Sequence, residues 1–164
     1  MKGPICKEDI KYGKLCMICK AKLKAGQITQ IDFELAKAIN KLENKKFLLA
    51  TELVRAFELP KIIIIFARGN VGALIGREGK NIKALEKVLG KKVRVVELSD
   101  PKDTIQQVMG RIRVVAVNKV FKQEGEELKA IIDERDMKKI ASERERLEEI
   151  LNKILKVPVA ISFS

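Results

Sequence analysis

Residues 71–85, VGALIGREGKNIKAL, are the most informative part of this 164-residue sequence. Gly76 and Gly79 are three residues apart, between a short apolar helical turn at 70–75 and an amphipathic helix predicted over 80–89. Because glycine has no Cβ, a turn of this kind lets a ligand come close to the backbone. The helix that follows presents free N–H groups and a partial positive charge to the same place. The spacing therefore predicts a turn that binds a phosphate group.

Charged side chains surround these two glycines. Arg77, Lys80 and Lys83 add positive charge next to the turn, whereas Glu78 weakens its attraction for phosphate. A nucleotide-binding P-loop is excluded, because that motif needs four residues between its first glycine and a closing Gly-Lys-Ser/Thr. The turn is therefore suited to a phosphate chain, and not to a nucleoside triphosphate held by a P-loop.

The positive charge of the chain is unevenly placed. The sequence has 34 Lys and Arg against 22 Asp and Glu, which gives a net charge of +12 and a pI of about 9.7. The excess lies in residues 1–24, with 7 basic and 2 acidic side chains, and in residues 60–99, with 9 basic and 3 acidic. Such concentrated charge favours a polyanion, such as nucleic acid, as the partner. The Lys- and Glu-rich surface of a heat-adapted protein explains the total charge but not its placement.

Hydrophobic periodicity predicts the same order of elements twice. The first set is a helix, two strands, two helices and a strand, at 31–44, 52–59, 61–67, 70–75, 80–89 and 92–98. The second set is a helix, two strands, a short helical turn, a helix and a strand, at 103–109, 112–121, 128–132, 137–140, 146–155 and 157–163. An offset of 65 residues superimposes the apolar positions of the two sets, which indicates an internal repeat.

This arrangement resembles a type II KH domain, in which a GXXG loop clamps about four nucleotides of single-stranded backbone. The resemblance rests on IGREGKNI, residues 75–82, and on the order of elements around it. It implies an α+β fold with two tandem type II KH domains, each helix-strand-strand-helix-helix-strand, the second of them degenerate. We expect a small basic Cys-containing element at 1–28, a KH domain at 29–99 and a degenerate KH-like domain at 100–164.

The resemblance also implies which residues bind RNA. Contacts are expected from the loop and from the start of the next helix, at Gly76, Arg77, Glu78, Gly79, Lys80, Asn81 and Lys83. Bases are expected in an apolar groove lined by Val71, Leu74, Ile75 and Ile82, with the strand around Val93. The alternative for these apolar side chains is packing in the core. In the second repeat, Ala141-Ser142-Glu143-Arg144 replaces the glycine loop, so side chains obstruct the backbone and a structural or docking role is expected.

The chain as a whole resembles the archaeal NusA-like proteins, which correspond to the RNA-binding part of the bacterial transcription elongation and termination factor NusA. The resemblance covers residues 31–164 and implies binding of single-stranded RNA in transcription, without enzymatic activity. The alternative is a protein-docking adaptor of RNA polymerase, or of ribosomal and RNA-processing particles, in which RNA contact is secondary. Binding to bulk RNA separates the two, because the adaptor needs none.

Three cysteines lie near the N-terminus, an odd number that argues against a closed disulfide framework. The segment resembles the short Cys-bearing extension found in an archaeal subset of the family, which contains two C-x-x-C pairs. Here Cys16 and Cys19 form one pair, and Cys6 is followed by Asp9 at the position of the missing cysteine. Thiolates and a carboxylate are acceptable ligands, so zinc bound by these four residues is predicted. A knuckle that has lost its metal and a redox-active C-x-x-C are the alternatives.

Other functions find less support in the sequence. The chain has no His, which excludes mechanisms that use a His base. An acidic cluster at Asp133, Glu134 and Asp136 could hold a metal, but a solvated loop explains it more simply. The longest apolar run, 62–67, is far too short to span a bilayer, and the charged N-terminus is unlike a signal peptide. We therefore expect a cytoplasmic protein that is not an enzyme and has no membrane partner.

Overall fold

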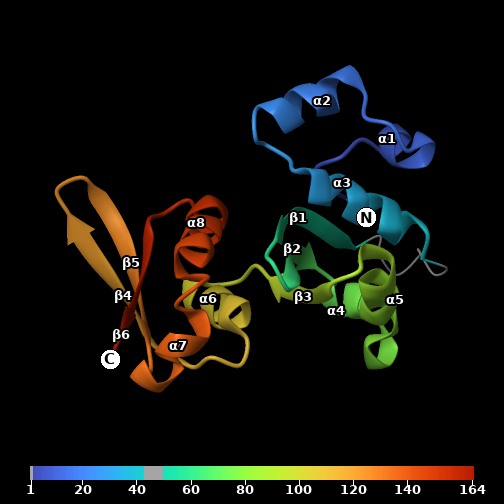
Figure 1. Cartoon of the computed structure of the whole chain (residues 1–164). Helices are drawn as coiled ribbons and strands as arrows, with labels where there is room; N and C mark the ends of the chain where they lie inside the picture. The colour runs from blue at the N-terminus through green and yellow to red at the C-terminus, as the bar shows by residue number, and fades with distance from the viewer. Residues whose placement is uncertain (1, 43–49) are drawn as a thin grey trace. The chain divides into compact units, whose positions relative to one another are not determined.

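A computed structural model describes residues 2–42 and 50–164 of the chain (Figure 1). Contacts within the chain define two compact units, Met1–Leu98 and Ser99–Ser164, which we call the N-terminal unit and the C-terminal unit. The last residues of the helix predicted at 31–44 fall outside the described residues. No helix within the described ranges is long and apolar enough to cross a membrane.

The N-terminal unit contains a three-stranded sheet in the predicted order of elements. The order is helix, strand, strand, helix, helix, strand: α3 (Gln30–Asn40), β1 (Thr51–Glu58), β2 (Ile62–Gly69), α4 (Val71–Ile75), α5 (Lys80–Leu89) and β3 (Lys92–Glu97). The central strand β2 pairs antiparallel with β1 and parallel with β3. Gly90 ends α5 in the left-handed conformation, as glycine commonly does at the end of a helix.

One apolar cluster joins α3, α4 and α5 to the sheet of this unit. Residues at helical spacing on α3, α4 and α5 meet alternate residues of the three strands, because side chains repeat every 3.6 residues in a helix and every two in a strand. The buried members are Ile31, Leu35, Ala38, Ile39, Leu53, Ala56, Ile63, Ile65, Ala67, Val71, Leu74, Leu85 and Val93. Both α4 and α5 contribute to it, so the glycine turn between them is anchored at both ends.

A buried carboxylate ties the start of α3 to the sheet. Asp32 is only 4% exposed and forms a capping box with Thr29, whose backbone N–H donates to Asp32 Oδ2 at 2.8 Å. The N–H of Ala56 on β1 donates to Asp32 Oδ1 at 2.6 Å, and Arg55 Nε lies 3.4 Å from Oδ2. One side chain therefore satisfies donors from the helix end and from the strand.

Two short helices that the sequence did not predict precede α3. They are α1 (Lys7–Tyr12) and α2 (Met17–Lys24), and they pack on α3 through an apolar cluster that includes Ile5, Ile28 and Phe33.

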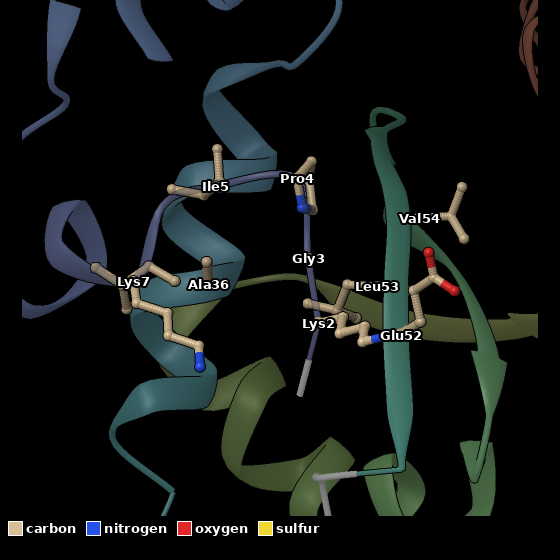
Figure 2. Close-up of a pocket in the computed structure, with 10 residues that line it drawn as sticks. Lys2, Gly3, Pro4, Ile5, Lys7, Ala36, Glu52, Leu53 and Val54 are labelled. Carbon is tan, nitrogen blue, oxygen red and sulfur yellow. The ribbon is translucent and has the colours of Figure 1, made fainter. Parts of the chain in front are cut away.

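The residues before α1 pair with the edge of the sheet. Lys2 N–H donates to the Thr51 carbonyl at 3.0 Å, and Leu53 N–H donates to the Lys2 carbonyl at 2.8 Å. Figure 2 shows this segment beside β1, around a hollow of about 740 Å³ that Ala36 of α3 also lines. The paired segment covers part of an edge strand that would otherwise offer free backbone groups.

The C-terminal unit repeats the topology. Its elements are α6 (Pro101–Met109), β4 (Val114–Lys122), β5 (Gly125–Ile132), α7 (Met137–Ile140), α8 (Arg144–Leu155) and β6 (Val159–Phe163). The central strand β5 pairs antiparallel with β4 and parallel with β6. Helix α6 begins at Pro101, before the predicted start at 103, because Asp100 caps it and accepts from Lys102 N–H at 2.9 Å. The predicted fold class, α+β with two KH-like units in tandem, is confirmed.

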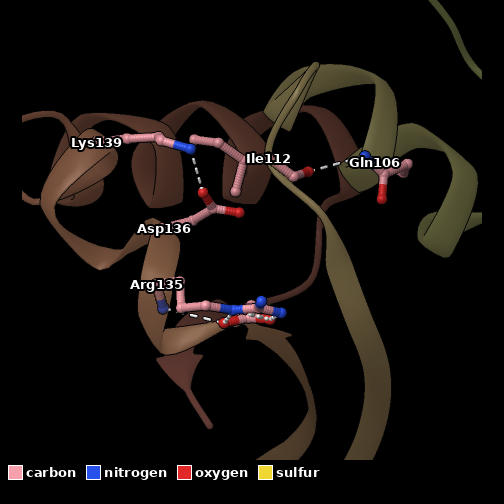
Figure 3. A network of polar contacts seen from close by, with 6 residues as sticks. Gln106, Ile112, Arg135, Asp136 and Lys139 are labelled. Carbon is pink, nitrogen blue, oxygen red and sulfur yellow. Dashed lines mark hydrogen bonds and ion pairs between the residues drawn. The ribbon is translucent and has the colours of Figure 1, made fainter.

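Polar contacts hold the C-terminal unit together at its turns. Gln106 of α6 donates to the Ile112 carbonyl at 2.9 Å (Figure 3). In the turn before α7, Asp133 pairs with Arg135 at 2.6 Å and Asp136 with Lys139 at 2.5 Å. The hydrogen-bonded Arg135 guanidinium holds the pKa of Asp133 well below its usual range. Two acidic residues of this turn are thus paired with cations, and among the described residues the turn forms no cluster of metal ligands.

Candidate nucleic-acid interface and candidate metal centre

The glycine turn between α4 and α5 has an unusual backbone. Gly76 has φ 76° and ψ 165°, and Gly79 has φ 72° and ψ 19°. Between them Glu78 also has a positive φ, of 52°, which L-residues adopt only at some cost in energy. Three of the four residues from 76 to 79 therefore lie outside ordinary right-handed conformations, and the chain reverses sharply before α5.

The two glycines are needed for different reasons. A Cβ at Gly76 would lie 2.8 Å from Asn81 Cγ, whereas a Cβ at Gly79 would meet open space. Asn81 is held in place because its side-chain amide donates to the Ala73 carbonyl at 2.9 Å. The predicted role of Asn81 as an RNA contact is thus accompanied by a structural one, which links α5 back to α4 across the turn.

We expect Gly76→Ala to destabilise the N-terminal unit much more than Gly79→Ala. The first change adds both a clash with Asn81 and a strained backbone, so its free energy of unfolding should fall by about 2–4 kcal/mol. The second adds only left-handed strain, about 1 kcal/mol. Urea unfolding followed by circular dichroism measures both values. Equal losses would mean that the contact with Asn81 does not hold the turn.

Exposed cations surround this turn. Arg77, Lys80 and Lys83 are exposed, as is the opposing Glu78. The turn adjoins a hollow of about 1100 Å³, which Lys41 and Leu42 of the residues after α3 also line. Sequence reasoning missed these two residues, since they lie more than 30 positions before the turn and no local motif marks them. Cations from two parts of the chain, Lys41 after α3 and Arg77 and Lys80 at the turn, therefore line the hollow, which suits a phosphate chain.

The apolar residues expected in the base-binding groove do not share one environment. Ile75 is 37% exposed and Ile82 is half-buried, so both offer apolar surface beside the turn. Leu74 is completely buried and Val71 and Val93 nearly so, all within the core. Leu74 has no exposed surface with which to touch a base, so its predicted role as a base contact is wrong. Val71 and Val93 keep 7% and 8% of their surface exposed, and their role at the groove stays a prediction.

The edge strand β3 offers a polar group on the free edge of the first sheet. Val93 N–H is capped by Glu86 Oε1 at 3.0 Å, and Leu98 N–H donates to Ala67 on β2 at 2.9 Å. Because N–H groups alternate in direction along a strand, Val95 N–H points away from β2. It has no acceptor among the residues that the structure describes. An unpaired backbone donor at the edge of a sheet is suited to the polar edge of an unstacked base.

In the C-terminal unit, a side chain covers the backbone N–H group that corresponds to that of Val95. Asn152 caps Val159 N–H at 2.6 Å, as Glu86 caps Val93, and Lys156 ends α8 in the left-handed conformation as Gly90 ends α5. These pairs differ by 66 residues, so the predicted offset of 65 is wrong for the last helix and strand. At an offset of 66, Ile82 corresponds to Glu148, and Val95 to Ile161.

The side chain at this corresponding position is a carboxylate. Glu148 Oε1 accepts from Ile161 N–H at 2.7 Å and also from Arg144 Nε at 3.2 Å. The C-terminal unit therefore has a charged side chain on the edge-strand donor that the N-terminal unit leaves open. It also lacks both glycines, since Ala141 has an ordinary helical φ of −52° where Gly76 has a positive one.

The three cysteines and Asp9 lie together between α1 and α2. One ligand atom from each of Cys6, Asp9, Cys16 and Cys19 lies within 4.8 Å of all the others, and the Cys19 and Cys6 sulfur atoms are 3.4 Å apart. When zinc binds sulfur ligands tetrahedrally at a bond length of about 2.3 Å, the sulfur atoms lie about 3.8 Å apart. This separation falls between the 3.4 Å and 4.8 Å found here. The cluster has the donors and the size for a metal ion.

The electrostatics of the cluster also fit a cation. Asp9 is only 4% exposed, and its Oδ2 has no hydrogen-bond partner. Burial raises the pKa of the Cys19 thiol to about 12, and its hydrogen bond to Asp9 acts in the same direction, whereas this bond lowers the pKa of Asp9. A bound cation would satisfy the orphaned carboxylate oxygen and take the place of the thiol proton. These four residues therefore could hold a metal.

Comparison with known proteins defines the class of this one. Residues 40–128 match the KH domain family, which is more than half of the chain, so the protein belongs to that family. The match begins at the end of α3 and includes the glycine turn and both edge strands of the first sheet.

Two individual proteins are also similar to it. A 40-residue segment is 45% identical to the probable transcription termination protein NusA of Methanocaldococcus jannaschii. This segment is 24% of the present chain, and it spans about a fifth, 22%, of the length of that curated relative. A solved structure described as "Crystal structure of APE1850" is 26% identical, over 62% of this chain and 79% of that one, with a TM-score of 0.47.

Proposed function

We propose that this protein binds single-stranded RNA at the glycine turn of its N-terminal unit and has a NusA-like role in transcription elongation or termination. The observation that carries the proposal is the turn itself. Its glycines, Gly76 and Gly79, free the backbone for a phosphate chain, and the cations Arg77, Lys80 and Lys83 surround it. Similarity to the archaeal NusA relative supports the transcription part of the proposal.

The two units have different tasks in this proposal. Bases of the bound strand lie against Ile75 and Ile82 and pair with Val95 N–H, while the turn holds the phosphates. The C-terminal unit, in which Glu148 covers the equivalent donor, acts as a structural or docking partner. The protein binds and carries out no chemical step of its own.

Comparing single-stranded with double-stranded RNA tests this function. We expect micromolar-order affinity for the single strand and weaker binding of the duplex, because only unstacked bases can enter the groove. If the turn and its cations neutralise about 3 to 4 phosphates, log K should fall against log salt with a slope of about −2 to −3. Fluorescence anisotropy at about 50 to 200 mM salt measures the affinity for each RNA and the salt slope. Equal affinity for the two RNAs would indicate a nonspecific basic surface.

A protein-docking adaptor of RNA polymerase or ribosomal components is the second candidate function. Phe121, near the tip of the hairpin formed by β4 and β5, is 80% exposed and favours it. The adaptor needs no affinity for bulk RNA. The same titration therefore separates the two functions.

We also propose that the cluster of Cys6, Asp9, Cys16 and Cys19 binds zinc. Support comes from the four converging donor atoms and from the unpartnered Asp9 Oδ2. Zinc bound there would tie α1 to α2, which are short helices of six and eight residues. Its role would be to stabilise this element, because four protein ligands leave no open position for a substrate.

Metal analysis of paired variants tests the zinc proposal. The protein purified without chelator should contain about one zinc per chain, and Asp9→Asn should weaken zinc binding by about 10-fold to 100-fold. Glu8→Gln is the matched control, since Glu8 is the exposed neighbour of Asp9 on α1. Elemental analysis and competition with a chromogenic chelator give the two values. If several preparations contain no zinc while α1 and α2 are still folded, zinc binding by this cluster is ruled out.

A further inference from the structure

Large apolar side chains are exposed at the turn between α1 and α2. Tyr12 is 69% exposed, Met17 87% and Ile18 66%, and these three occur within seven consecutive residues. The cluster of Cys and Asp ligands lies nearby, where it brings the start of α1 close to the start of α2. We call these three residues the N-terminal apolar surface. The helices α1 and α2 that carry it lie on the other side of α3 from α4 and α5 (Figure 1).

Positive charge surrounds this surface. The element carries lysines along both helices and the turn between them: Lys7, Lys11, Lys14, Lys20, Lys22 and Lys24. Among the residues that the structure describes, none of these lysines forms an ion pair with a carboxylate. The only exposed acid of the element is Glu8, because Asp9 is buried among the cysteines.

This combination fits a nucleic acid better than a protein partner. Lysine is depleted in protein–protein interfaces, whereas lysines beside an aromatic ring are typical of surfaces that hold single strands. Tyr12 presents such a ring, and Lys11 Nζ lies 5.4 Å from its centre. A base can stack on an exposed ring, and the free ammonium groups can neutralise its phosphates.

We propose that the N-terminal apolar surface is a second contact for single-stranded RNA. Tyr12 stacks on one base, and Met17 and Ile18 contact the face of the next base. Lys11 and Lys14 bind the phosphates of the same strand. The inference rests on the proposed function of the glycine turn, since it extends the path of the same strand. Short RNA then occupies the turn alone, and longer RNA reaches both contacts.

Two RNA lengths test the second contact on the full chain, purified without chelator. A single strand of about 6 nucleotides fills the glycine turn, which holds about four, and one of about 20 can extend beyond it. The variant Tyr12→Ala/Met17→Ala/Ile18→Ala should bind the long RNA about 10-fold or more weakly and the short RNA unchanged. Its control removes three exposed apolar side chains from the C-terminal unit: Val115→Ala, Phe121→Ala and Met137→Ala. This control should bind both lengths like the wild type.

A second variant keeps the apolar surface and changes only charge. Lys11→Gln/Lys14→Gln should reduce the salt slope for the long RNA by about 1.4, since each phosphate contact to a single strand contributes about 0.7. Zinc content equal to that of the wild type shows that the element is intact in each variant. Unchanged affinity and salt slope for the long RNA would overturn the proposal and leave a protein partner for this surface. Equal losses on both lengths would also overturn it, whereas failure of the glycine turn itself appears as lost binding of the short RNA.

Discussion

Replacing Arg77 and Lys80 by Asp should lower the affinity for a short single-stranded RNA by about 30-fold or more at 0.1 M salt. Each change removes a cation beside the turn and puts a carboxylate where a phosphate lies, so attraction becomes repulsion at close range. Both residues are exposed, and the glycines that form the turn are kept. The fold should therefore survive, because surface changes of this kind usually alter stability by no more than about 0.5 kcal/mol. Fluorescence anisotropy with a strand of about 6 nucleotides measures the loss.

A control variant separates position from total charge. Lys102→Asp/Lys138→Asp changes the net charge by the same amount, at two exposed lysines of the C-terminal unit. We expect its affinity to stay within about twofold of the wild type, because neither lysine belongs to the unit that carries the glycine turn. Equal losses from the two double variants would mean that overall charge, and not the glycine turn, binds the RNA.

Asp32→Ala should destabilise the N-terminal unit by about 3–5 kcal/mol. The change leaves the Ala56 and Thr29 N–H groups without the acceptors that now lie at 2.6 and 2.8 Å, and it removes the carboxylate partner of Arg55. Breaking a buried charged network in this way costs far more than removing an exposed group. Thermal and urea unfolding followed by far-ultraviolet circular dichroism give the loss.

Glu34→Ala is the matched control for this prediction. Glu34 lies two residues further along α3 but is exposed, and its carboxylate accepts from the Gln30 side-chain amide at 3.4 Å. Its stability should change by no more than about 0.5 kcal/mol. If Asp32→Ala proved as mild as Glu34→Ala, the buried carboxylate would not be what joins α3 to β1.

Much of the fold could be predicted from the sequence because its signals are local. The glycines at 76 and 79 mark the turn, Gly90 marks the end of α5, and four successive isoleucines mark the buried strand β2. The α5 helix begins and ends where its apolar spacing predicts, at Lys80 and Leu89. Local patterns of this kind fix the type and order of elements.

Features that depend on distant contacts could not be predicted. Leu74 and Ile75 are adjacent apolar residues, yet one is in the core and the other is exposed, since the direction of each side chain depends on how α4 packs. The offset of 66 in the last helix was also missed, because Leu147 and Ile150 fit an apolar pattern at 65 equally well. The hydrogen bond from Val159 to Asn152 and the left-handed Lys156 at the end of α8 fix the register.

The N-terminal element was predicted in composition but not in structure. Its helices are too short to show a clear period, and α1 has only six residues. The resemblance to the Cys-bearing extension implied the four candidate ligands, and the structure brings all four together. It could not indicate that Tyr12, Met17 and Ile18 are exposed, because exposure depends on how α1 and α2 pack on α3.

Amide chemical shifts in the full chain test the central claim most directly. The nitrogen-15-labelled protein is titrated with a single-stranded RNA of about 6 nucleotides, and each N–H signal is followed. We predict the largest shifts at residues 75–83 and at Val95, with the glycine amides of the turn among them, and little change at 141–148. Shifts that are absent from 75–83, or that are as large at 141–148, would contradict the assignment of RNA binding to the glycine turn of the N-terminal unit.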